Sequence, residues 1–156
     1  MLNNSKPYKQ KGHQKERREE VVAEEPRPRI PLGTYDAVCF DMNIKQSQGG
    51  AWKVYLNFRI CGGEYDGTEL FMCCPKPNYK LRERHKLHKQ MSLALGRTLY
   101  KGERLSKKIF IKKMYKVLVR DTHRRYQDTN KIMPDFMQYS VVRGIIEAST
   151  GVSDET

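Results

Sequence analysis

The sequence lacks any long apolar run. Among its 156 residues, no segment approaches the length of about 18 apolar residues that a membrane-spanning helix needs. The N-terminal stretch MLNNSKPYKQKGHQ also lacks the apolar core of a secretory signal peptide. We therefore expect no membrane segment and no secretion, and we expect a cytoplasmic protein.

Cysteine is scarce, and its spacing is unlike that of a disulfide framework. The cysteines are Cys39, Cys61, Cys73 and Cys74. Adjacent cysteines rarely form such a framework, so we interpret all of them as reduced cytosolic thiols. A zinc site would combine Cys61, Cys73 and Cys74 with His85 and His88, but structural zinc usually takes close pairs of the C-x2-C type. We expect no metal and no cofactor, although zinc binding by this set stays open.

Clustered carboxylates and nucleotide-binding loops are missing as well. Two-metal hydrolysis of phosphodiesters requires grouped carboxylates. The basic region 76–125 has only three acidic residues, Glu83, Glu103 and Asp121, and they are far apart in the sequence. No Walker-type glycine loop and no Ser-His-Asp set is present. We therefore expect no enzyme and no catalytic residues, and a nuclease is the least favoured alternative.

Positive charge, in contrast, is abundant and concentrated in one part of the chain. The net charge is +12, and residues 76–125 contain 17 Lys and Arg against three acidic residues. Such segregation is typical of a surface that binds a polyanion. A solvated basic surface without any ligand is the alternative.

The first 29 residues resemble a tail more than a part of a domain. The stretch KPYKQKGHQKERREEVVAEEPRPR mixes both charge signs and offers little to bury. Burial cannot offset the entropy of ordering such a segment. We predict a disordered charged tail over 1–29, a folded domain over 30–148 and a flexible acidic end over 149–156.

Three strand patterns, separated by glycine-containing turns, occupy residues 30–75. In TYDAVCFDMNIK one parity holds Val38, Phe40, Met42 and Ile44. In GGAWKVYLNFRICGG the apolar parity holds Trp52, Val54, Leu56, Phe58 and Ile60, and the other holds Lys53, Tyr55, Asn57 and Arg59. TELFMCC follows as a third strand, with Phe71 outward. This alternation predicts strands with one buried face, joined by hairpin turns at QSQGG and CGGEYDGT.

The second half of the domain adds one helix and two more strands. Helical spacing predicts an amphipathic helix from Asn78 to Gly96 with a basic outer face. IFIKKMYKVLVRD predicts a fourth strand and FMQYSVVRGIIEA a fifth, with a basic-aromatic loop between them. The order β-β-β-α-β-β predicts an all-β domain with one helix, the five-stranded, partly open barrel of the OB-fold.

Several segments, in this order and spacing, also carry a family resemblance. They are PLGTYDAVCFD, GGAWKVYLNFRI, GEYDGTELF, a helix ending in LALG, and KKIFIKKMYKVLV, between Pro31 and Glu147. The chain resembles a family of small phage- and plasmid-encoded proteins, long classed as a domain of unknown function and regarded as OB-fold single-stranded DNA-binding proteins. The resemblance implies a role in phage or plasmid replication or recombination, in the host cytoplasm if phage-encoded. Typical relatives have a Gly-Lys pair before the fourth strand, where this chain has FIKKMYKV.

The outward parity of residues 52–60 predicts a nucleic-acid platform. OB-folds bind ligands on strands two and three, between the loops that join strands one to two and four to five. Single-strand binders combine cations for phosphates with aromatic rings for bases. The predicted nucleic-acid-binding residues are Lys45, Trp52, Lys53, Tyr55, Asn57, Arg59, Phe71, Lys112, Lys116, Arg120, Arg124, Arg125, Tyr126 and Lys131. Trp52 has the core parity, so its role would require a bulge near residues 49–50.

Other partners stay open because a fold does not fix its ligand. We expect non-catalytic binding of single-stranded DNA with little sequence preference. An RNA-binding OB-fold protein and a protein-partner-binding module are the alternatives. A replication or recombination protein bound through the tail, and a homodimer, stay open as further partners.

Overall fold

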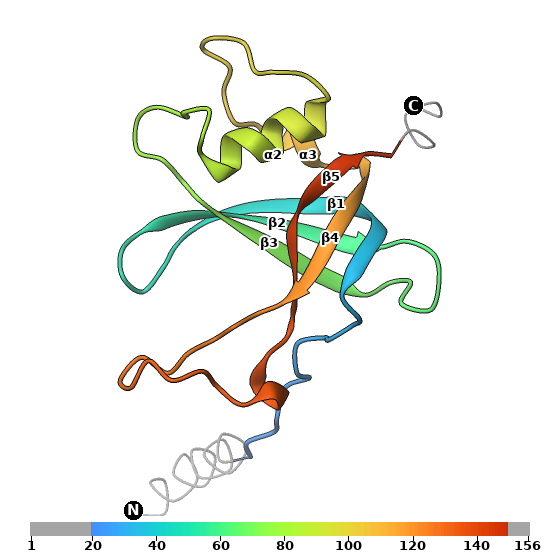
Figure 1. Ribbon diagram of the computed structural model, residues 1–156, viewed down its shortest axis with the longest axis vertical. Helices are drawn as coiled ribbons and strands as arrows, with labels where there is room; N and C mark the ends of the chain where they lie inside the picture. The colour runs from blue at the N-terminus through green and yellow to red at the C-terminus, as the bar shows by residue number, and fades with distance from the viewer. Residues whose placement is uncertain (1–19, 150–156) are drawn as a thin grey trace, which may run out of the picture.

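The computed structural model describes residues 20–149, so the predictions for 1–19 and 150–156 lie outside the described residues. Its main feature is a five-stranded antiparallel sheet in the order β3-β2-β1-β4-β5 (Figure 1). The elements are β1 Gly33–Gln46, β2 Trp52–Ile60, β3 Glu69–Pro75, α2 Lys86–Leu95, α3 Lys107–Phe110, β4 Met114–Asp121, η1 Asp135–Met137 and β5 Ser140–Ala148. The predicted all-β, OB-like fold with one main helix between the third and fourth strands is confirmed.

The sheet curls so that its two outer strands approach each other. The ring of Phe71 on β3 lies 6.2 Å from that of Tyr139, which directly precedes β5. Helix α2 bridges the same two strands, because Lys86 Nζ donates to the Cys73 carbonyl of β3 at 3.0 Å and Gln90 Oε1 accepts from Ile145 N of β5 at 2.7 Å. The result is a partly open barrel with α2 at one end (Figure 1).

The core consists of the inward parity of the strands and one face of α2. Its fully buried members include Val54, Leu56, Phe58, Met72, Leu87, Met91, Phe110, Tyr115, Val117 and Val119. The predicted inward parity of β2, from Val54 on, is therefore confirmed, and in β4 the buried parity runs from Tyr115 to Val119. Tyr115 donates its hydroxyl to the carbonyls of Ile109 and Phe110, which satisfies a polar group that would be costly to bury alone.

The parity predicted for β1 is mostly wrong. That prediction placed inward the side chains of Val38, Phe40, Met42 and Ile44, of which only Met42 is buried. A bulge between Cys39 and Asp41 in the pairing with β2 inserts one extra residue, Phe40. Because alternation has a period of two residues, the extra residue exchanges the faces, so Ala37 and Cys39 are buried before it.

The helix is shorter than predicted. It begins at Lys86, and its N-cap is His85, whose Nδ1 accepts from Leu87 N at 3.1 Å, so Asn78 is not the cap. None of residues 78–85 is buried, and among them only Leu81 packs, half-buried, against the core, which is too little to hold a helical turn there. The predicted C-terminal glycine is confirmed, since Gly96 adopts a left-handed φ of 72° and donates to the Ser92 carbonyl.

The last two strands also begin later than predicted. Ile109 and Phe110 form the helical turn α3, which the Ser106 hydroxyl caps by accepting from Lys108 N at 3.2 Å. Lys112 then has a φ of 67°, which is incompatible with a continuous strand. Before β5, the predicted strand start at Phe136 lies in the turn η1.

Candidate nucleic-acid interface

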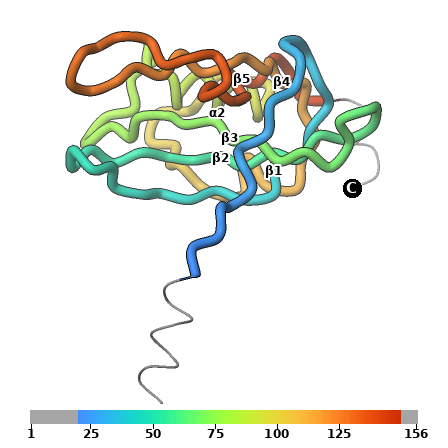
Figure 2. The backbone as a smooth tube through the Cα atoms, turned by 90° about the horizontal axis from the view of Figure 1, so that it is seen from below, coloured from blue at the N-terminus to red at the C-terminus, as the bar shows by residue number. Residues whose placement is uncertain are grey.

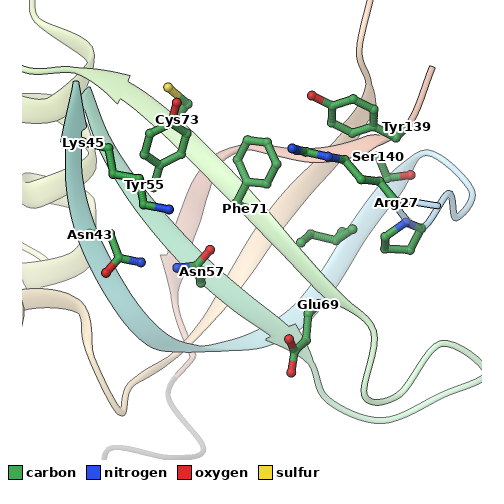
Figure 3. A pocket seen from close by; sticks show the side chains of 12 residues that line it. Arg27, Asn43, Lys45, Tyr55, Asn57, Glu69, Phe71, Cys73, Tyr139 and Ser140 are labelled. Carbon is green, nitrogen blue, oxygen red and sulfur yellow. The ribbon is translucent and has the colours of Figure 1, made fainter. Parts of the chain in front are cut away.

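A groove of about 640 Å³ lies on the outer face of the first three strands (Figure 3). The sheet contributes to its lining Asn43, Lys45, Tyr55, Asn57, Glu69, Leu70, Phe71 and Cys73. The segments beside β5 contribute Arg27, Pro28, Tyr139 and Ser140. The groove thus spans the junction between the two outer strands.

Strand register explains how these side chains come together. Tyr55 of β2 lies opposite Asn43 of β1 and opposite Cys73 of β3. One step along the same face, Lys53 lies opposite Lys45. Directly opposed residues of antiparallel strands project to the same side. The outward face predicted for β2 is therefore confirmed as a surface, and it contributes Tyr55 and Asn57 to the groove.

Three aromatic rings form a line across the groove (Figure 3). The Tyr55 and Phe71 ring centroids are 5.7 Å apart, and those of Phe71 and Tyr139 are 6.2 Å apart. All three side chains are half-buried, so each is anchored but still accessible. Desolvation raises the pKa of the Tyr55 hydroxyl above its ordinary value of 10.

Three cations flank this line of rings. The Arg27 guanidinium lies 5.1 Å from the Phe71 centroid and 4.8 Å from that of Tyr139. Lys45 Nζ lies 5.8 Å from the Tyr55 centroid, and the Arg124 guanidinium lies 5.5 Å from that of Tyr139. Cations at such distances are attracted to the ring faces. The groove therefore alternates flat aromatic surface with positive charge.

The segment before β1 brings Arg27 to the groove. Arg29 pairs with Asp121 and Asp135 at 2.9 Å each, which also lowers the pKa of the Asp135 carboxyl. Pro28 accepts from Ser140 N at 3.1 Å. Residues 27–29, which the sequence prediction assigns to the disordered tail, thus contact the domain. Figure 2 shows this segment running over the outside of the barrel.

Sequence reasoning named Lys45, Tyr55, Asn57 and Phe71 among the residues that line the groove and missed the others. Two of the missed residues, Arg27 and Tyr139, belong to the line of rings and cations. Tyr139 lies within the predicted fifth strand, and its aromatic ring beside a basic loop was a usable signal. Arg27 carried no such signal, because it lies in a stretch with mixed charges and without periodicity.

Arg59 was predicted to contact phosphates, but its charge is already compensated. Its guanidinium pairs with Glu69 of β3 at 2.9 Å, and it lies 4.5 Å from the ring centroid of Phe40. Glu69 is the cross-strand neighbour of Arg59 and lines one end of the groove. The cationic surface therefore ends at this pair.

The predicted residues on and before β4 lie away from the groove. The sheet order puts β1 between β4 and β2. None of the predicted residues Lys112, Lys116 and Arg120 lines the groove. Lys116 pairs with Asp36 at 3.5 Å, Arg120 is exposed on β4, and Lys112 precedes that strand. The structure does not bring these three cations together with the aromatic line.

The loop between β4 and β5 contributes only Arg124 to the cations around the aromatic line. Arg125 donates to the Asn130 carbonyl at 3.0 Å within the same loop, and Tyr126 directs its hydroxyl to Met137 Sδ at 3.9 Å. Lys131 is exposed and outside the groove lining. The loop folds back on itself through a bridge between Arg125 and Ile132, and none of the predicted loop residues lines the groove.

Trp52 is exposed for a different reason from the one predicted. It is the first residue of β2, opposite Gln46, and 48% of its surface is accessible. The pairing of β2 has no shift near residues 49–50, so the required bulge is absent from this described hairpin. Because Trp52 lies at the end of the strand, beyond the core, its indole ring is exposed to solvent. Neither Trp52 nor Lys53 lines the groove.

Among residues 20–149, no group of three or more His, Cys, Asp or Glu side chains could hold a metal ion. The cysteines are free, and burial raises the pKa of Cys39 to about 12 and that of Cys74 to about 11. None of the described helices is long and apolar enough to cross a membrane.

Comparison with known proteins adds no assignment. No protein-family model matches the chain, and no curated protein is significantly similar to it. The chemistry of the groove therefore has to indicate the ligand. Aromatic faces and cations suit a molecule that combines flat rings with negative charge.

Proposed function

We propose that the protein binds single-stranded DNA, without catalysis and with little sequence preference, in the cytoplasm. The observation that carries this proposal is the line of Tyr55, Phe71 and Tyr139 flanked by Arg27, Lys45 and Arg124. Unpaired bases can stack on such rings, whereas in a duplex the bases stack on each other and are inaccessible. A role in phage or plasmid replication or recombination follows from the family resemblance.

The binding mode has two parts. Bases stack on the three rings, and each stack contributes about 1–3 kcal/mol regardless of base identity. Phosphates contact Lys45, Lys53, Arg27 and Arg124, which releases counterions and makes affinity fall with salt. Few groove residues can read base edges, Asn43 and Asn57 among them, so sequence preference is weak.

Fluorescence anisotropy tests the proposal directly. Labelled oligo(dT), the matching duplex and oligo(U) are titrated at several salt concentrations. We expect tight, salt-sensitive binding of oligo(dT) and weak binding of the duplex. A preference for oligo(U) would show that the ligand is RNA and not DNA. Equally weak binding of all three nucleic acids would overturn the proposal in favour of a protein partner.

Variants of the aromatic line test the site itself. Tyr55→Ala and Tyr139→Ala should each weaken oligo(dT) binding by about 1–3 kcal/mol, and Tyr139→Phe should retain most of the affinity. Phe136→Ala is the matched control, because Phe136 is 83% exposed and does not line the groove. If Tyr139→Ala and Phe136→Ala bind oligo(dT) with equal affinity, the groove is not the binding site.

A further inference from the structure

A second groove, of about 880 Å³, lies next to α2. It is bounded by residues 76–81, by Leu87 and His88 of α2, and by the loop 99–105. In Figure 1 this region lies at the helix end of the barrel, where the segments before and after α2 form long loops. The predicted site residues include none of this region.

The second groove repeats the chemistry of the first. Tyr79 is 97% exposed and Tyr100 is 69% exposed, although both line the groove. The cations in its lining are Lys76, Lys80, Lys101 and Arg104. Among residues 20–149, the side chains of these four cations make no ion pair. Exposed aromatic rings and uncompensated cations are the two kinds of group that a single-strand binder presents to bases and phosphates.

One carboxylate in the groove is already neutralised. Glu103 accepts from both terminal nitrogens of Arg97, at 2.9 and 2.7 Å, and from Tyr100 N at 2.9 Å. These bonds lower the pKa of Glu103 to about 2. The same arginine lies 4.2 Å from the Tyr100 centroid. Glu103 thus holds the loop and presents Tyr100 without cancelling the lysine charges.

The two grooves are adjacent along the chain, although no residue lines both. Cys73 lines the first and Lys76 lines the second. Three residues of extended chain span at most about 10 Å. Lys86 at the start of α2 donates to the Cys73 carbonyl, which fixes the helix against this stretch of β3.

We infer that the second groove binds the continuation of the same DNA strand that the first groove holds. The inference rests on the proposed function, and three observations support it: uncompensated positive charge, exposed tyrosines, and continuity with the first groove. A strand leaving Tyr55 and Cys73 passes Lys76 and reaches Tyr79 and Tyr100. The protein therefore occupies a longer stretch of DNA than one sheet surface would.

The test compares oligonucleotides of two lengths. OB-folds occupy about 4–16 nucleotides, so oligo(dT) of about 6 nucleotides fills one groove and about 15 nucleotides can reach both. Tyr79→Ala/Tyr100→Ala should weaken binding of the longer oligonucleotide at least about tenfold and leave the shorter one unchanged. Lys80→Gln/Lys101→Gln should act on the longer oligonucleotide alone and reduce its salt dependence.

The control pair is Lys108→Gln/Lys113→Gln, since both lysines are exposed and line neither groove. Unchanged binding of the longer oligonucleotide by both second-groove variants would overturn the inference, as would equal losses at both lengths. Neither result touches the proposed function. That function fails instead if the wild-type protein binds neither length or if Tyr139→Ala has no effect.

Discussion

Lys45 and Lys53 lie directly opposite each other on β1 and β2, on the same face as Tyr55. Like charges in directly opposed positions destabilise a sheet, and no carboxylate among the described residues pairs with either lysine. A phosphate between them would convert this repulsion into attraction. At the scale of single residues, this pair opposes stability in the free protein and favours binding of a polyanion.

Lys53→Gln should therefore change stability and affinity in opposite directions. Removing one of two opposed charges should stabilise the free protein by about 0.2–1 kcal/mol. Losing one phosphate contact should weaken oligo(dT) binding and reduce the salt slope by about one. Urea unfolding and salt-dependent anisotropy measure the two effects. Lys113→Gln, which is outside the groove, should show neither the gain in stability nor the smaller salt slope. A Lys53→Gln variant that is less stable than the wild type and has an unchanged salt slope would contradict this account.

The cysteines offer a probe of the groove that needs no substitution. Cys73 is half-buried and lines the groove, whereas Cys61 is half-buried in the turn after β2, outside the groove lining. Bound oligo(dT) should slow iodoacetamide labelling of Cys73 several-fold and leave that of Cys61 unchanged. Buried Cys39 and Cys74 should react slowly in either state, because their thiols stay protonated. Equal protection of Cys73 and Cys61, read by mass spectrometry, would locate the ligand elsewhere.

At the scale of elements, α2 holds the barrel where its sheet is open. The Gln90 carbonyl accepts from Ile145 N, and its amide lies 3.1 Å from the position that a Cβ on Gly144 would occupy. A side chain at that glycine would therefore compete with Gln90 for space. Because the helix and the strand approach each other closely, the neutral Gln90 side chain can accept a hydrogen bond from the backbone of β5.

Gln90→Ala should leave the buried Ile145 amide without its partner. The expected cost is about 1–3 kcal/mol of unfolding free energy, the penalty of an unsatisfied buried donor. Leu93→Ala on the same helix is the control, because Leu93 is 38% exposed and is not among the buried residues of α2. Urea unfolding measures both. A Gln90→Ala variant no less stable than Leu93→Ala would show that α2 does not hold β5 through this bond.

At the scale of the whole molecule, carboxylates paired with arginines hold the segment before β1 and the loop after α2 in place. Asp135 and Asp121 hold Arg29 and the segment before β1, and Glu103 holds Arg97. The pKa of Asp135 is lowered and that of Glu103 falls to about 2, in each case first by the hydrogen bond from its arginine. Both carboxylates therefore favour the folded state only while they are ionised.

Stability should fall in acid for this reason. The contribution of Glu103 is complete above its ordinary pKa of 4.5 and is lost as the pH falls toward about 2. Glu103→Gln should be less stable than the wild type at neutral pH and should lose less stability between these limits. Thermal unfolding across this range measures both effects. Glu83→Gln, an exposed acid outside any described ion pair, should keep the wild-type profile.

Much of the fold could be predicted because alternation and turn chemistry are local. Val54, Leu56, Phe58 and Ile60 are buried as their period predicts. The same reasoning failed in β1, because the bulge at Phe40 depends on pairing with β2 and leaves no periodic mark in the sequence. It failed before β4 as well, where the cap at Ser106 outweighed the strand propensity of Ile109 and Phe110.

The sequence by itself determined which side chains of β2 and β3 face outward, and therefore Tyr55, Asn57 and Phe71 as candidate contacts. Only the tertiary structure decided that Arg27 and Tyr139 complete the aromatic line, and that Glu69 compensates Arg59. The physical reason is that parity follows from one strand alone. Ion pairs and stacked rings depend instead on register and on closure of the barrel, which join segments far apart in the chain.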